Sequence, residues 1–126
     1  MGSLIKSFLH TKMAKRLAGF MFSRGSRLLP VKKLRENSTW LAFIHHKPCY
    51  PIHIVIVPKR EIDDWMSLPL EDPALYADFV ELSQGMIRDF CLEETGYRLI
   101  INGGPYQTFP HLHAHLVAGD VLSKEQ

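Results

Sequence analysis

The chain has 126 residues, 46% of them hydrophobic and 22% charged, and its formal net charge is +2. This length fits one domain and excludes a (β/α)₈ barrel, which typically needs about 250 residues. No apolar run approaches the roughly 20 residues that a membrane-spanning helix needs. The cysteines, Cys49 and Cys91, lie far apart and form no C-x-x-C pair, so neither a disulfide framework nor a cysteine zinc site is indicated.

The small net charge conceals a basic N-terminal arm. Residues 1–35 contain nine Lys and Arg residues and no acid, whereas residues 36–126 carry a net charge of −7. Apolar residues recur every four positions within the arm, which predicts an amphipathic helix. These residues are Leu9, Met13, Leu17 and Met21.

Several roles are open for residues 1–27, which we treat as a separate arm. An amphipathic helix can pack on its own domain or on a partner subunit, and a basic one can bind an anionic membrane surface. A basic, serine-containing segment without acids also fits a mitochondrial presequence. Nucleic-acid binding is disfavoured because no aromatic-interleaved motif or zinc finger accompanies the charge. We expect a cytoplasmic, reducing location, or a mitochondrial one if the arm is a presequence.

The remaining sequence predicts strands around one long helix. In chain order we expect a strand at Trp40–Ile44, a strand at Ile52–Val57, a short helical turn at Ile62–Leu68, a helix from Asp72-Pro73 to near Gly96, a strand at Tyr97–Ile101, a turn at Asn102–Pro105 and a strand at His111–Val117. Asp72 is suited to cap the helix and Pro73 to begin it. This order favours an α+β domain built on an antiparallel sheet.

The strongest motif is an alternation of histidines near the end of the chain. His111, His113 and His115 alternate with apolar residues, a pattern expected by chance in only about two chains in a hundred of this length and composition. On a strand, the three imidazoles would share one exposed face at intervals of roughly 6–7 Å, while the apolar residues pack inward.

Aligned imidazoles suit chemistry at phosphorus. A neutral central imidazole could attack a phosphate, and its neighbours, some of them cationic, could stabilise the charge or protonate the leaving group. Backbone N–H groups of the preceding loop could cradle the phosphate, and the side chains of Gln107 and Thr108 could donate further hydrogen bonds. Zinc ligation is a rival interpretation, with His45 or His46 completing the site, but the motif contains no carboxylate base.

The segment from His111 to Val117 resembles the histidine-triad (HIT) motif, and the chain is most similar to the Hint-like nucleotide-binding and hydrolase branch of that family. The resemblance covers about residues 28–120 and includes other segments in the same order. These are Leu41-Ala42-Phe43, Pro48 and Pro51, His53–Lys59, Gly96–Asn102 and Gln107-Thr108. It implies that residues 28–126 form a HIT domain with a sheet of about five antiparallel strands, one long helix and one short helix.

The resemblance also implies a nucleotide hydrolase or transferase acting on the α-phosphate of a phosphoramidate, adenylate or dinucleoside polyphosphate. His113 would be the nucleophile and form a nucleotidyl-histidine, His115 would contact the phosphate, and His111 and His53 would orient the nucleophile. Asn102, Gln107 and Thr108 would hold phosphate oxygens or the leaving group. The resemblance further implies a homodimer that needs no metal and no other cofactor.

One position departs from the family pattern. His45, which follows Ile44, stands where the family commonly has an acid that holds the ribose hydroxyls. We expect both residues to line the substrate site. This departure leaves open a second function, a nucleotide-binding or scaffolding module with vestigial catalysis. A third alternative is a metal hydrolase, if the histidines bind zinc.

Overall fold

The computed structural model of the protein describes residues 33–122. Its elements in chain order are β1 (Lys33–Glu36), β2 (Trp40–Ile44), β3 (Ile52–Pro58), the 3₁₀ turn η1 (Trp65–Ser67), α3 (Pro73–Asp89), α4 (Leu92–Thr95), β4 (Arg98–Ile101), the 3₁₀ turn η2 (Gly104–Tyr106) and β5 (Ala114–Ala118). The predicted helix of the basic arm, the rest of the arm and residues 123–126 lie outside the described residues.

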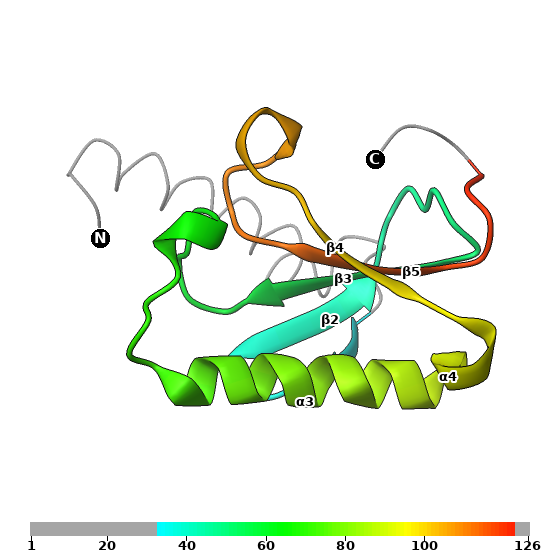
Figure 1. Ribbon diagram of the computed structural model, residues 1–126, viewed down its shortest axis with the longest axis horizontal. Helices are drawn as coiled ribbons and strands as arrows, with labels where there is room; N and C mark the ends of the chain where they lie inside the picture. Colours follow the sequence, from blue (N-terminus) through cyan, green and yellow to red (C-terminus); the bar gives the residue numbers. More distant parts are fainter. Residues whose placement is uncertain (1–32, 123–126) are drawn as a thin grey trace.

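The strands form one five-stranded sheet in the order β1-β2-β3-β5-β4, and every neighbouring pair is antiparallel. The helix α3 lies along one side of this sheet, as Figure 1 shows. These features confirm the α+β class, the antiparallel sheet and the pairing of one long helix with one short helix. Among the described residues, no helix is both long and apolar enough to cross a lipid bilayer.

The start of α3 follows from its sequence. The side chain of Asp72 accepts a hydrogen bond from the backbone N–H of Leu75, and Pro73 occupies the first helical position. The cap gives a hydrogen-bond partner to one of the first N–H groups of the helix, which have none within the helix. Proline is tolerated at the first position because an N–H there would make no bond within the helix. The predicted helix start is therefore confirmed.

The end of the helix differs from the prediction. We expected one helix to continue to near Gly96, but α3 ends at Asp89 and α4 follows after Cys91, whose backbone is left-handed with φ 56°. The turn at Cys91 redirects the chain so that Leu92 is buried in the core. Gly96, with φ 105°, then ends α4, a conformation that glycine adopts readily.

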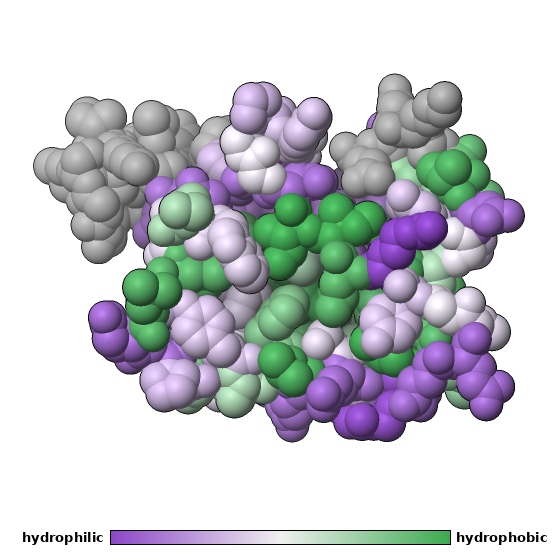
Figure 2. Space-filling view, in the orientation of Figure 1, coloured by the Kyte–Doolittle hydropathy of each residue, from purple (hydrophilic) through white to green (hydrophobic). Residues whose placement is uncertain are grey.

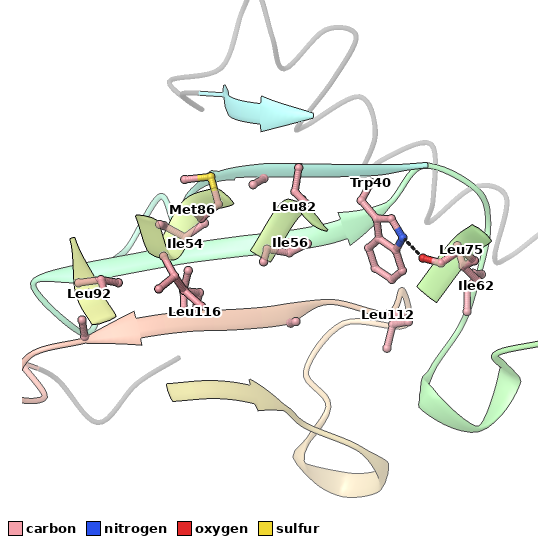
Figure 3. Close-up of a cluster of buried hydrophobic side chains, with 14 residues drawn as sticks. Trp40, Ile54, Ile56, Ile62, Leu75, Leu82, Met86, Leu92, Leu112 and Leu116 are labelled. Atoms are coloured by element: carbon pink, nitrogen blue, oxygen red, sulfur yellow. Dashed lines mark hydrogen bonds between the residues drawn. The ribbon is translucent and has the colours of Figure 1, made fainter. Parts of the chain in front are cut away.

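The core lies between α3 and one face of the sheet, and Figure 3 shows its members. The indole Nε1–H of Trp40 donates to the backbone oxygen of Leu75 at 2.8 Å, which ties β2 to the first turn of α3. Alternate residues of the central strands, together with apolar residues of α3, make up most of this cluster. They include Ala42, Ile54, Ile56, Leu82, Met86, Ala114 and Leu116. Because strand residues alternate between faces, His53 and His115 lie on the opposite face.

The last strand is shorter than predicted. We expected a strand from His111 to Val117, but β5 begins at Ala114. The backbone N–H of His111 donates to Phe109 and that of Leu112 donates to Ile62, so neither group joins a strand ladder. The first two histidines of the motif therefore lie in the segment that leads into β5, and only the third lies within the strand.

Candidate active site

Two histidines of the candidate site meet across the central strands. His53 lies on β3 opposite Val117, and His115 lies on β5 opposite Val55, so both side chains are on the face away from α3. His53 Nε2 and His115 Nδ1 are 2.9 Å apart, which is a hydrogen bond. Both side chains are buried, at 2% and 4% exposure. The sheet itself therefore holds this pair in a fixed relative position.

The backbone assigns the proton positions of this pair. The N–H of Cys49 donates to His53 Nδ1 at 2.9 Å, so a neutral His53 carries its proton on Nε2. That Nε2–H donates to His115 Nδ1, and the proton of a neutral His115 must then lie on Nε2. The chain of contacts leaves His115 with one free ring N–H, which can donate a hydrogen bond to a bound anion.

His113 has the opposite arrangement. Its Nδ1 lies 2.7 Å from the backbone oxygen of His111, so Nδ1–H donates, and in the neutral ring the lone pair lies on Nε2. The His113 ring is half-buried and lies edge-on to the His115 ring, with 5.2 Å between centroids and 77° between planes. A nucleophilic nitrogen and a hydrogen-bond donor are therefore supplied by neighbouring rings, as acyl or phosphoryl transfer requires.

His111 is turned into the protein. Its Nε2–H donates to the backbone oxygen of Pro58 at 3.1 Å, and within residues 33–122 its buried Nδ1 has no hydrogen-bond partner. The motif predicts three imidazoles on one exposed face, but both His111 and His115 are buried. That expectation was wrong because the first histidine links the segment before β5 to the end of β3, while its carbonyl orients His113.

His45 extends the site on its β2 side. It follows Ile44, the half-buried last residue of β2, and its ring stacks on that of His53 with 4.2 Å between centroids and 25° between planes. The His46 ring also stacks on that of His45, with 5.1 Å between centroids, and the N–H of Lys47 donates to His45 Nδ1 at 2.9 Å. The proton of a neutral His45 therefore lies on Nε2.

The loop before the triad contributes the other predicted residues. Asn102 follows β4 directly, and because Ile101 pairs with Ala114, the antiparallel register places Asn102 opposite His113. Asn102 is half-buried and Thr108 is exposed. The structure therefore brings Asn102 to the level of His113 and leaves the Thr108 side chain exposed.

Gln107 holds the loop itself. Its Nε2 donates to the backbone oxygen of Asp63 at 2.8 Å and to that of Phe109 at 2.9 Å. Both protons of an amide nitrogen are then in use. In this structure the Gln107 amide ties the loop before the triad to the loop after β3, and its carbonyl oxygen is the group left for other contacts.

Burial lowers the pKa values of four histidines of the site. It lowers the pKa of His115 to about 3, assisted by the charges of His113, His53 and His45, and it lowers the pKa of His45 to about 4. Burial also lowers the pKa values of His53 and His111. We expected some of these imidazoles to be cationic, but each of the four is neutral at neutral pH. An anion must therefore be bound by N–H donors.

The hydrogen bonds of the cluster argue against a metal site. Nitrogen atoms of His45, His53 and His115 all lie within 4.8 Å of one another. However, the Nδ1 atoms of His45 and His53 accept backbone N–H groups, so their Nε2 atoms carry protons and have no lone pair for a metal. If a metal bound both Nε2 atoms, the protons of His45 and His53 would move to Nδ1. Each Nδ1–H would then face a backbone N–H, and two donors cannot pair with each other. The residues present do not fit a His₃ zinc site.

Backbone groups that sequence analysis did not identify complete the site. The N–H of Cys49 and the carbonyl oxygens of Pro58 and His111 each orient one histidine. The Tyr50 ring also meets His53 edge-on, with 5.6 Å between centroids. A backbone donor has no residue-type signature, and the only available signal was the position of Cys49 between two prolines in a tight loop.

Comparisons with known proteins identify the family of the chain and its fold. A family model for the HIT domain matches residues 27–122. A HIT-like protein of Chlamydia pneumoniae is 32% identical over 97 residues, covering 75% of this chain and 87% of that protein. A HIT family hydrolase from Legionella pneumophila has a TM-score of 0.69 and 28% identity, covering 82% of this chain and 92% of its own.

A more distant solved structure shows the same fold. The histidine triad nucleotide-binding protein from Candida albicans has a TM-score of 0.68, covering 91% of this chain and 81% of that protein. Its sequence identity is 21%, so the similarity concerns the fold alone.

Proposed function

The chain belongs to the histidine-triad (HIT) family, and from this premise we propose that it is a nucleotide hydrolase or nucleotidyl transferase acting at an α-phosphate. The substrates we propose are nucleotide conjugates, namely a phosphoramidate, an adenylate or a dinucleoside polyphosphate. The observation that carries the proposal is the fixed proton arrangement of His113, whose Nδ1–H bonds the His111 carbonyl and leaves Nε2 free.

In the first step, His113 Nε2 attacks the α-phosphorus. The N–P bond forms as the bond from phosphorus to the leaving group breaks, and the leaving group takes a proton from solvent. The resulting nucleotidyl-histidine carries a positive charge on its ring, which the His111 carbonyl stabilises through the Nδ1–H hydrogen bond at 2.7 Å. In the second step, the oxygen of water or of another acceptor attacks the same phosphorus. The P–O bond forms as the N–P bond breaks, the acceptor gives up its proton to solvent, and His113 Nε2 regains its lone pair.

His115 supports the phosphate in both steps. Its Nε2–H is the donor left free by the His53 contact, and a phosphate oxygen that gains charge in the transition state would accept it. A neutral donor of fixed orientation suits this role because the burial that keeps it neutral also strengthens its hydrogen bond. No metal or other cofactor is needed for these steps.

Residues around the triad supply the substrate contacts that we propose. His45 offers a donor at Nε2 and no acceptor, so the substrate oxygen that it meets must accept a hydrogen bond. Asn102 and Thr108 would hold phosphate oxygens or the leaving group, and Gln107 would keep their loop in place. Ile44 would provide apolar contact beside His45.

The test is a panel of the three substrate classes, with mass spectrometry for a nucleotidyl adduct. The parent protein should turn over at least one class and carry the adduct on His113. Replacement of this residue, His113→Ala, should lower kcat by about three orders of magnitude or more and leave nucleotide binding in place. The matched control is His10→Ala, which removes a histidine of the arm.

Full activity of His113→Ala would refute the mechanism. A parent protein that binds a nucleoside monophosphate and turns over no member of the panel would instead support the binding or scaffolding module with vestigial catalysis. The parent protein is active in the first case and inactive in the second, so the same experiment distinguishes the two results.

We also propose that the protein is a homodimer paired through β4. This strand is at the edge of the sheet and, among the described residues, pairs only with β5. Leu99 and Val80 are 41% and 47% exposed, and Figure 2 shows hydrophobic side chains gathered between α3 and the β4 edge. An unpaired, partly apolar edge is a surface that a second copy could cover. Sedimentation equilibrium should give a molecular mass twice that of one chain, and Leu99→Lys should reduce it to the mass of a single chain.

The arm of residues 1–27 is proposed to determine location or partners, because the candidate site is built entirely from residues 44–115. A cytoplasmic location is our first proposal, and a mitochondrial one follows if the arm is a presequence. Fusion of residues 1–27 to a fluorescent protein tests this directly. Import and cleavage would support the mitochondrial alternative, membrane-surface localisation would support lipid binding, and diffuse fluorescence would support the cytoplasm.

A further inference from the structure

The segment after β5 lies directly against the loop that precedes β3. The ladder between β3 and β5 ends at the pair Ile52 and Ala118, and the next two residues are Pro51 and Gly119. A Cβ atom added to Gly119 would lie 2.7 Å from Cγ of Pro51, and the Gly119 φ is +87°. Glycine is therefore required here twice over, for its backbone conformation and for the closeness of the proline ring.

A hydrogen bond continues this contact. The backbone N–H of Leu122 donates to the carbonyl oxygen of Cys49 at 2.6 Å. The N–H of the same Cys49 donates to His53 Nδ1 at 2.9 Å. The two polar groups of one buried residue thus connect the segment after β5 to a histidine of the site.

We propose that Gly119–Leu122 is a positioning segment, which holds the 47–51 loop so that the Cys49 N–H keeps His53 and His115 in the proton arrangement needed to bind phosphate. The proposal rests on the function proposed above, in which the His115 Nε2–H donates to the phosphate. It assigns a role to a segment that contains none of the histidines.

The reason lies in the two tautomers of neutral imidazole. With the Cys49 N–H at its side, His53 Nδ1 must accept, so Nε2–H faces His115. If the loop moved away, His53 could carry its proton on Nδ1 and present a lone pair to His115. His115 would then carry its proton on Nδ1 and donate it in a hydrogen bond to His53. Its Nε2 would have no N–H to donate to the phosphate oxygen. A small displacement of the loop therefore removes a donor from the site.

The first test compares two glycines. Gly119→Ala forces Pro51 and its loop away, whereas Gly96→Ala is the matched control, since Gly96 also has a positive φ but a Cβ there meets nothing within 4 Å. Both variants bear backbone strain. We expect Gly119→Ala to lower kcat on the order of ten- to a hundredfold with a small change in KM, and Gly96→Ala to retain the parent kcat.

The second test avoids strain at a glycine. Leu122→Pro removes the N–H that bonds Cys49, and Leu122→Ala keeps that N–H while removing the same side chain. Leu122 is exposed, so neither change opens the core. We expect Leu122→Pro to lower kcat in the same way as Gly119→Ala, and Leu122→Ala to behave as the parent.

The deciding readout is the imidazole ¹⁵N spectrum, which reports the tautomer of each histidine without any turnover. The parent and both controls should show the Nε2–H form at His53 and His115, and Gly119→Ala and Leu122→Pro should show a mixture. Parent-like spectra in both of these variants would overturn the proposal. If the parent turns over no substrate, the proposed function fails, but the spectra still decide whether the segment sets the tautomers.

Discussion

Acidification should destabilise the folded protein through His115. Burial lowers the pKa of this imidazole to about 3, whereas an unfolded histidine has a value near 6.5. Between these values the unfolded chain binds a proton that the folded chain does not. The contribution of His115 to the free energy of unfolding should therefore be present in full above pH 6.5 and be lost as the pH drops towards 3.

The size of the effect follows from the two pKa values. One pKa unit corresponds to about 1.4 kcal/mol, so moving from pH 7 to pH 4.5 should cost about 2.5 kcal/mol at His115 alone. His45, with a pKa of about 4, acts in the same direction. Since small domains are stable by only about 5–15 kcal/mol, this is a substantial part of the total.

Urea unfolding at pH 7 and pH 4.5 measures the effect, with His115→Gln as the comparison. Carboxylates such as Glu36 are present in both proteins, so their contributions cancel in the difference between the two pH dependences. The parent should lose about 2.5 kcal/mol more than His115→Gln over this interval. Equal losses in the two proteins would refute the reasoning, because they would show that His115 does not resist protonation in the fold.

Three further predictions concern the framework that positions the site. Trp40→Phe removes the Nε1–H donor to the Leu75 carbonyl and should cost about 1–3 kcal/mol in urea unfolding; an unchanged midpoint would contradict that bond. Asp72→Ala removes the cap of α3 and should cost about 1 kcal/mol, with Asp72→Asn as a control that retains the cap. Leu82→Ala opens a cavity in the core and should cost about 2–5 kcal/mol, and a loss below 1 kcal/mol would indicate that α3 packs elsewhere.

Hydrophobic periodicity was sufficient to predict most of the framework. The strand at Ile52–Val57 and the start of α3 at Pro73 follow from local patterns, because a β-branched run between two prolines and an Asp-Pro cap act over a few residues. The break at Cys91 did not follow. The tertiary burial of Leu92 sets this break. The left-handed position is occupied by Cys91 and not by the glycine that usually marks such a position in a sequence.

The candidate site was predictable in its residues and less so in their geometry. His113 stands out from the motif alone, because three alternating histidines are rare by chance. The burial of His111 and the stacking of His45 depend on distant strands and a loop, which a local pattern does not encode. Gln107 shows the same limit, since the partners of its amide are backbone carbonyls that any residue could supply.

The two tryptophans give the molecule two separate optical reporters. Trp40 is 3% exposed in the core beneath α3, so its fluorescence should follow global unfolding. Trp65 is 52% exposed in η1, and the Gln107–Asp63 hydrogen bond joins its loop to the loop before His111. Ligand binding that displaces that loop should change the Trp65 emission while Trp40 stays constant. With Trp40→Phe or Trp65→Phe, one instrument can follow occupancy and folding independently.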